Sequence, residues 1–228
     1  MLGLDSPPIA VTFLAEGASA PAVAAFDEPM SEPTADGRSG RVPASCVFWS
    51  KAFTSTFSTL PADHGNCSVG RWVHGFAALE AIAGADDVGL LFSSGWVTSE
   101  DVSRVEVITE PAERIVYGPL SEATASPNVV VLHLNPRQMM ALADAVPGVE
   151  LNGKPQCQIV ARAKAGRASI SMGCALSRER TAMSEADLTC AIPGAELGAV
   201  VERLRAVTAA DTAVRDYAGN DLSRFDSR

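Results

Sequence analysis

The five cysteines of this chain stand alone in the sequence, and this spacing restricts the folds available to it. Cys46, Cys67, Cys157, Cys174 and Cys190 include no closely spaced pair, so the ligand knuckles that build zinc ribbons and zinc fingers are absent. An odd number of cysteines also does not complete a disulfide framework. The fold must therefore be held by an ordinary hydrophobic core, for which 228 residues with 47% hydrophobic content are sufficient.

The charge of the chain restricts its partners. The net charge is −9 at pH 7, and no stretch is rich in lysine or arginine, so no nucleic-acid partner is expected. Residues 1–17 lack a basic region and carry Asp5, which indicates neither a signal peptide nor a membrane-spanning helix, and no membrane partner is expected. The expected location is the cytoplasm, where thiols stay reduced. The oligomeric state, a homo-oligomer included, is left open.

Apolar and turn-forming residues follow one another in a pattern that mixes strands and helices. Because no regular strand–helix–strand rhythm is present, we expect a single α+β domain over residues 1–210, a mixed sheet with helices packed on it. A long surface loop is expected at 17–43, where prolines and glycines gather, and a polar, loosely attached tail at 211–228. Strands are predicted at 8–14, 115–120, 128–134, 168–172 and 187–192, and helices at 44–57, 68–82, from Pro136 to Pro147, and at 195–207.

The cysteines differ in their predicted surroundings. Cys46 falls in the first turn of a predicted helix, and Cys67 lies at or just before the start of the next. That position is expected to lower the pKa of the Cys67 thiol, because helix starts expose free amide donors. Cys174 follows a glycine at a strand end, and Cys157 opens an apolar stretch. Cys190 lies within an apolar strand and is assigned to the core.

Dispersed cysteines at element ends are suited to an iron–sulfur cluster. We expect a 4Fe–4S cluster held by Cys46, Cys67 and Cys174, with Cys157 as the fourth ligand or as a nearby thiol. Three thiolates would leave one iron open as a Lewis acid for a small anionic molecule, in a non-redox lyase or a sulfur transferase. A fourth thiolate would favour electron transfer instead.

Two alternatives stay open beside the cluster. In one, the protein is a metal-free small-molecule-binding or accessory protein with structural cysteines, since free cysteine is among the most buried residue types. In the other, Cys67 is a catalytic nucleophile, with His64 as its base and Arg178 orienting an anionic substrate. For His64 the competing interpretation is a solvated loop histidine, and for the charged stretch 178–180 it is a solvated loop.

Several other chemistries have no support in the sequence. It contains no Walker A motif, no GxGxxG after a strand and no GxSxG, so neither nucleotide binding nor serine hydrolysis is indicated. Only three histidines are present. Such a small number weakens any histidine-rich metal site.

Four short stretches carry a family resemblance. They are 45–52 with Cys46; 64–70 with Cys67, followed by Gly75; 128–131, followed by Asn135 and Pro136; and 171–174, followed by Arg178 and Thr181. In their order and spacing they resemble a prokaryotic uncharacterised family, domain of unknown function one-six-nine, over residues 9–205. The resemblance implies a fold and a cysteine set, but no reaction. Some members carry a further cysteine where this chain has Ser177, so a fourth ligand from that loop is not supported.

Overall fold

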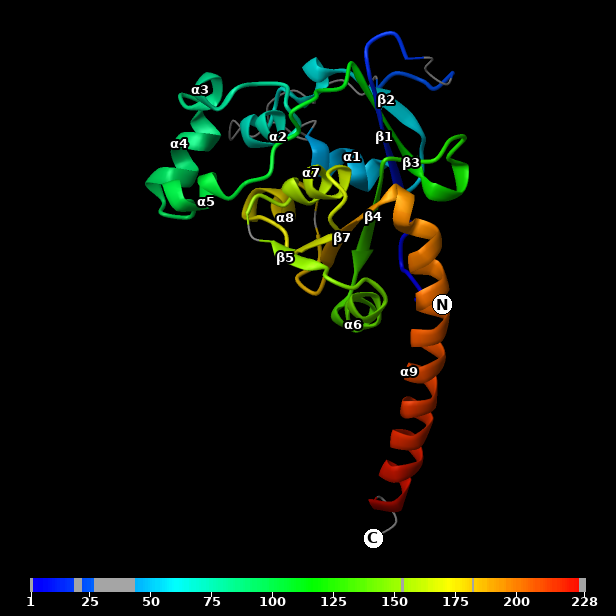
Figure 1. The fold of residues 1–228 in the computed structure, drawn as a ribbon. Helices are drawn as coiled ribbons and strands as arrows, with labels where there is room; N and C mark the ends of the chain where they lie inside the picture. The colour runs from blue at the N-terminus through cyan, green and yellow to red at the C-terminus, as the bar shows by residue number, and fades with distance from the viewer. Residues whose placement is uncertain (1, 19–21, 27–43, 153, 182, 226–228) are drawn as a thin grey trace.

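The structure is a computed structural model that describes residues 2–18, 22–26, 44–152, 154–181 and 183–225. These residues form a mixed sheet with helices packed on both faces (Figure 1), which confirms the predicted α+β fold. The predicted surface loop falls largely at 19–21 and 27–43, outside the described residues. The strands are β1 (Ile9–Leu14), β2 (Phe57–Thr59), β3 (Arg114–Pro119), β4 (Val129–Leu134), β5 (Glu150–Asn152), β6 (Ser169–Ser171) and β7 (Leu188–Pro193). The α-helices are α1 (Ser45–Lys51), α2 (Ser68–Val73), α3 (Leu79–Ile82), α4 (Asp86–Ser93), α5 (Ser99–Ser103), α6 (Pro136–Ala145), α7 (Gln158–Lys164), α8 (Ala175–Thr181) and α9 (Leu197–Phe225).

The N-terminal strand lies near the middle of the sheet. The order of the described strands is β2-β3-β1-β4-β7-β6-β5, and neighbours run antiparallel except for the parallel pair β5 and β6. Ile9 of β1 pairs with Pro119 of β3 on one side and with Val131 of β4 on the other. Segments that are far apart in sequence are therefore held side by side at the centre of the molecule.

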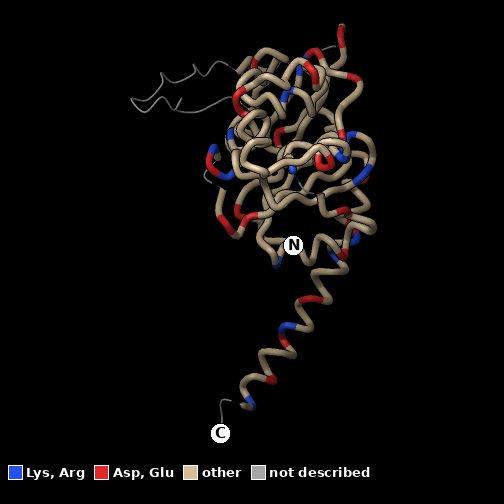
Figure 2. The backbone as a smooth tube through the Cα atoms, turned by 90° about the vertical axis from the view of Figure 1, so that its left-hand side faces the viewer, with Lys and Arg blue, Asp and Glu red and all other residues tan. Residues whose placement is uncertain are grey.

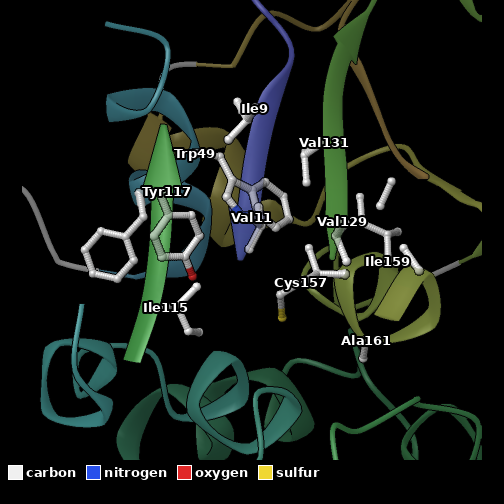
Figure 3. Close-up of a cluster of buried hydrophobic side chains, with 14 of the residues drawn as sticks. Ile9, Val11, Trp49, Ile115, Tyr117, Val129, Val131, Cys157, Ile159 and Ala161 are labelled. Carbon is white, nitrogen blue, oxygen red and sulfur yellow. The ribbon is translucent and has the colours of Figure 1, made fainter. Parts of the chain in front are cut away.

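Alternate residues of β4 contribute to two separate cores. Val129 and Val131 join the cluster on the face covered by α1 and α7, which Figure 3 shows with Cys157 at its border. Val130 and Leu132 join the second cluster, on the face covered by α6 and α9. This division is the two-residue period of a strand buried on both faces. It also places Cys157 and Cys190 in different cores.

Several predicted elements are confirmed, and the local chemistry explains why. Asn135 is the N-cap of α6, Pro136 is its first residue, and Gln138 completes a capping box with Asn135. The predicted strands at 8–14, 115–120 and 128–134 correspond to β1, β3 and β4. Each observed strand begins and ends within one residue of the predicted bounds.

Two predicted helices are shorter than expected. The helix predicted at 44–57 ends at Lys51, and Phe57 begins strand β2. The helix predicted at 68–82 breaks after Val73, because Gly75 has φ +76°. A Cβ atom at Gly75 would lie 2.3 Å from the Ile108 carbonyl oxygen, so the chain turns there and α3 is a separate helix.

The predicted end of the last helix was wrong. Helix α9 does not stop at 207 but continues to Phe225 and takes in most of the predicted tail. Only Val200 and Leu204 of α9 are buried, and its C-terminal half projects beyond the body (Figure 1). Acidic and basic residues are interspersed over the body and along this helix (Figure 2). No described helix has both the length and the apolar character needed to cross a membrane.

Candidate functional site

Four of the five cysteines line one pocket on the α1 and α7 side of the sheet. Cys46, Cys67, Cys157 and Cys174 come from four separate segments and meet there, whereas Cys190 lies in the core on the opposite face. The described lining includes no aspartate or glutamate. Much of the rest of the wall is apolar, from Val69, Leu91, Trp96, Pro155 and Leu176.

Each of these four cysteines stands at the start of a helix. Cys67 is the N-cap of α2, and its Sγ accepts a hydrogen bond from the Gly70 amide at 3.4 Å. Cys174 directly precedes α8, and its Sγ accepts one from the Ser177 amide at 3.3 Å. The other two are Cys46, the second residue of α1, and Cys157, the N-cap of α7. Four helix starts thus present amide donors toward one group of sulfur atoms, an arrangement that favours negative charge on sulfur.

Burial opposes this preference at Cys46, Cys67 and Cys157, where it raises the pKa of the thiol. Burial raises the pKa of Cys46 to about 12, with further contributions from the Cys67 and Cys174 thiols. Burial also raises the pKa of Cys157 well above its usual value, and the other three thiols of the pocket add to the shift. The prediction that its helix-start position lowers the pKa of Cys67 was wrong, because burial raises it more than the Gly70 amide lowers it.

Arg180 supplies positive charge to the pocket. Its guanidinium lies beside Cys67, where its charge and hydrogen bond lower the pKa of that thiol against the effect of burial, and it also lowers the pKa of Cys46. Its Nη1 atom is buried and has no hydrogen-bond partner among the described residues. A buried, unpaired guanidinium nitrogen is costly. The pocket is therefore built to receive an acceptor or an anion next to Arg180.

Arg178, predicted to orient a substrate, lies elsewhere. Its Nε donates to the Met172 carbonyl at 3.1 Å, Nη1 to the Ser184 carbonyl at 2.7 Å and Nη2 to the Asp187 carbonyl at 3.0 Å. These bonds hold together the loops on either side of α8, and Arg178 is not among the residues that line the pocket. The structure brings Arg180, rather than Arg178, to the cysteines.

His64 is buried, and the interpretation of this residue as a solvated loop histidine was wrong. Its side chain is 1% exposed, its Nδ1 lies 3.2 Å from the Ser45 hydroxyl and its Nε2 lies 3.1 Å from the Thr59 hydroxyl. Burial and the neighbouring His74 hold the pKa of His64 well below its usual value. Both ring nitrogens are thus committed to hydroxyl groups, and no hydrogen bond joins His64 to Cys67 in the structure described.

Ser45 joins the two buried histidines beneath the pocket. Nδ1 of His74 lies 2.8 Å from the Gly70 carbonyl oxygen, which can only accept, so Nδ1 carries the proton. That nitrogen also lies 3.3 Å from the Ser45 hydroxyl. The Thr59 hydroxyl donates to the Ile115 carbonyl at 3.4 Å, so it accepts from Nε2–H of His64, and Nδ1 of His64 accepts from Ser45. The tautomers follow from this chain, and the network fixes the helix starts that carry Cys46 and Cys67.

Ser177 lines the pocket, whereas Tyr117 belongs to the adjoining core. The Tyr117 hydroxyl is buried, and it interacts with Ser45 and with the Cys157 and Cys46 thiols. Ser177 is buried next to Cys174. Its hydroxyl contacts the Gln156 side-chain carbonyl and lies 3.0 Å from the Cys174 carbonyl oxygen.

The sulfur atoms do not form a site for a single ion. Among the described residues, no group of three or more histidine, cysteine, aspartate or glutamate side chains could hold one metal ion. A single zinc ion needs every ligand sulfur about 2.3 Å from one centre. A cluster of several irons binds each cysteine at a different iron, so its ligand sulfurs stand farther apart. Four thiols line one pocket beside the unpaired Nη1 of Arg180, and thiolates are the ligands that an iron–sulfur cluster uses.

Sequence reasoning missed both Arg180 and Tyr117. Arg180 had a signal, because Leu176, Ser177 and Arg180 follow Cys174 at helical spacing and share one face of α8. Tyr117 had none, because its place next to Ser45 and Cys157 depends on the packing of β3 against α1.

Comparison with known proteins gives a family and no more. Residues 1–203 match the family of domain of unknown function 169, described as uncharacterised ArCR. No curated protein and no solved structure matches the chain. The matched region contains all five cysteines and Arg180. The chain belongs to the domain of unknown function 169 family.

Proposed function

We propose that this protein binds a 4Fe–4S cluster through Cys46, Cys67, Cys157 and Cys174 and serves in electron transfer. The observation that carries the proposal is the meeting of four thiols, from four separate helix starts, in one pocket whose wall is largely apolar. Such a cluster supplies one-electron chemistry when it is bound. Because its ligands must stay reduced, we place the protein in the cytoplasm.

The charges around the pocket support an anionic, sulfur-rich occupant. Cysteine ligands bind metal as thiolates, so four thiolates bring negative charge into a site with no acidic side chain in its described lining. Amides donate to Cys67 and Cys174, and Arg180 offers one positive charge and an unpaired donor. Hydrogen bonds to sulfur are among the features that set the reduction potential of a cluster.

The same four residues argue against the ordinary interpretation of buried cysteines. Cys190 is an example of a core cysteine: it is fully buried and packs among apolar side chains of the second cluster. Cys46, Cys67 and Cys174 are only partly buried, and their sulfurs face a shared pocket. This contrast within one chain favours a ligand set over a structural role.

The experiment is anaerobic reconstitution of the reduced protein with ferrous iron and sulfide, for the wild type and for single variants. We expect Cys46→Ser, Cys67→Ser and Cys174→Ser each to lose most of the bound iron. Cys190→Ala is the matched control, since it removes a thiol on the other face of the sheet, and it should bind iron as the wild type does. Wild-type binding in all of the pocket variants would refute the proposal.

Cys157→Ser separates electron transfer from Lewis-acid chemistry. If the cluster needs four thiolates, this variant loses it too. If Cys157→Ser is the one pocket variant that keeps the cluster, the cluster has three cysteine ligands and one open iron beside Arg180. The protein then binds a small anionic molecule, as a lyase or a sulfur transferase. Mass spectrometry under native conditions distinguishes the two outcomes by the iron retained.

A further inference from the structure

Residues 76–107 form an excursion from the body between α2 and β3, here called the lid segment. It carries the short helices α3, α4 and α5. Its two ends meet at the base, where the Ile108 amide donates to the Val73 carbonyl at 2.9 Å. Gly75 lies at the same place in a left-handed conformation that leaves no room for a Cβ atom. The segment therefore leaves and rejoins the body at one narrow base.

The inner side of the lid segment forms part of the cysteine pocket. Leu91 and Trp96 belong to the lid segment and line the pocket together with the four thiols. They also line a second apolar cavity beneath the lid segment, which shares Val69 and Pro155 with the pocket as well. Removing the lid segment from the body would thus open one wall of the cysteine site.

The lid segment is only lightly packed. Of the eight residues of α4 only Val88 and Leu91 are buried, and Leu90 and Phe92 are 60% and 43% exposed. No residue of α5 is buried. Elements with so few buried apolar contacts open locally at a lower free energy than the core of a protein.

Two contacts fasten the far side of the lid segment next to cysteines. Oδ2 of Asp87 accepts a hydrogen bond from the amide of Ser68 at 3.0 Å, and Ser68 directly follows Cys67. Nζ of Lys154 donates to the Trp96 carbonyl at 2.5 Å and lies 4.1 Å from the centre of the Trp96 ring, three residues before Cys157. On the base side, Arg162 and Arg167 bond to the segment near its C-terminal end.

We propose that the lid segment opens and closes over the cysteine pocket, and that the Asp87–Ser68 and Lys154–Trp96 contacts are the latches that hold it shut. The lid controls the access of solutes to the four thiols. This inference concerns access alone and does not depend on which group the pocket holds. When the latches are broken, the base contacts stay in place, so the segment opens without unfolding the sheet.

The test measures thiol alkylation in reduced, metal-free protein. N-ethylmaleimide is added in limiting time steps, and peptide mass spectrometry gives a labelling rate for each cysteine. Lys154→Met keeps the apolar stem and removes the charge and the donor. Loss of one charge-assisted bond should raise the labelling of Cys46, Cys157 and Cys174 about tenfold, and Asp87→Ala should do the same. Cys67 is left out of the comparison because Asp87 also raises its pKa.

Two internal controls make the result decisive. Glu100→Gln changes a residue of the lid segment that forms an exposed ion pair with Arg104, the C-cap of α5. Because this ion pair does not connect the lid segment to the body, the variant should leave every labelling rate unchanged. Cys190 reports global unfolding, and its rate should stay constant in all variants. Unchanged rates at Cys46, Cys157 and Cys174 would overturn the proposal, and so would a rise at Cys190 in parallel with theirs. A protein that never bound iron would still give a clear answer in this test.

Discussion

At the scale of single residues, Arg180 is the main determinant of charge in the pocket. Its guanidinium lies beside Cys67, and its Nη1 is unpaired. A positive charge next to a cluster favours the reduced, more negative form. We expect Arg180→Gln to lower the reduction potential by on the order of 50 mV, close to the 59 mV of a tenfold change for one electron. Arg180→Lys keeps the charge and should recover most of the shift. Redox titration checks both, and equal potentials in the three proteins would contradict this role.

The buried histidines make stability depend on pH. Burial lowers the pKa of His74 to about 4 and the pKa of His64 well below its usual value. The unfolded chain then takes up protons below about pH 6.5 while the folded protein does not. We expect the free energy of unfolding to fall as the pH drops from 6.5 toward 4, by roughly 1 kcal/mol per pH unit for each histidine.

Urea unfolding at several pH values measures this dependence. His74→Asn removes one of the two groups and should give a shallower decline below pH 6.5. Between pH 7 and 8 the free energy of unfolding should stay nearly constant in the wild type and in His74→Asn, each compared with its own value at pH 7. Parallel curves from pH 6.5 to 4 would show that His74 does not contribute.

At the scale of elements, Gly75 permits the turn that starts the lid segment. It has φ +76°, and a Cβ atom there would lie 2.3 Å from the Ile108 carbonyl. Gly75→Ala should therefore lower the free energy of unfolding by roughly 2–3 kcal/mol. Gly89→Ala is the matched control, because no atom lies near its Cβ position within α4, and it should stabilise by about 0.5–1 kcal/mol. Equal effects in denaturant unfolding would contradict this account of the turn.

Elements with local signals could be predicted, and those decided by distant contacts could not. Asn135, Pro136 and Gln138 carry the whole start of α6 in adjacent positions. Nothing local ends the helix pattern at Lys51 in favour of strand β2, whose Phe57 pairs with Tyr117 far along the chain. The break at Gly75 was visible only as a glycine, since the clash that requires it comes from Ile108.

At the scale of the whole molecule, the C-terminal half of α9 stands apart from both cores. Val214, Tyr217, Leu222 and Phe225 are each more than 60% exposed, whereas Leu204 is 5% exposed. Deleting residues 213–228 should shift the melting temperature by less than about 2 °C, because none of the described residues 213–225 belongs to either core. Leu204→Ala leaves a cavity and should lower it by roughly 5–10 °C. Calorimetry decides this, and a large loss on deletion would mean that the exposed half of α9 has a partner in solution.

The sequence predicted which cysteines form the candidate site better than it predicted their surroundings. The positions of Cys46, Cys67 and Cys174 at element ends marked them as a set, and the apolar strand around Cys190 marked it as core. Their meeting depends on β1 lying between β3 and β4, on the packing of α1, α2 and α7 over one face of the sheet, and on the contact of α8 with α1. The direction of the Cys67 pKa shift was missed for the same reason, because burial is a property of the fold and not of one helix start.

The most direct measurement of the central claim is the iron and sulfide content of the protein, purified without oxygen, together with its visible spectrum before and after dithionite. The proposed ligand set predicts a coloured protein with about four irons and four sulfides per chain that bleaches on reduction. Cys190→Ala should behave in the same way. A colourless protein without iron, which also fails to take up iron and sulfide on reconstitution, would contradict the account.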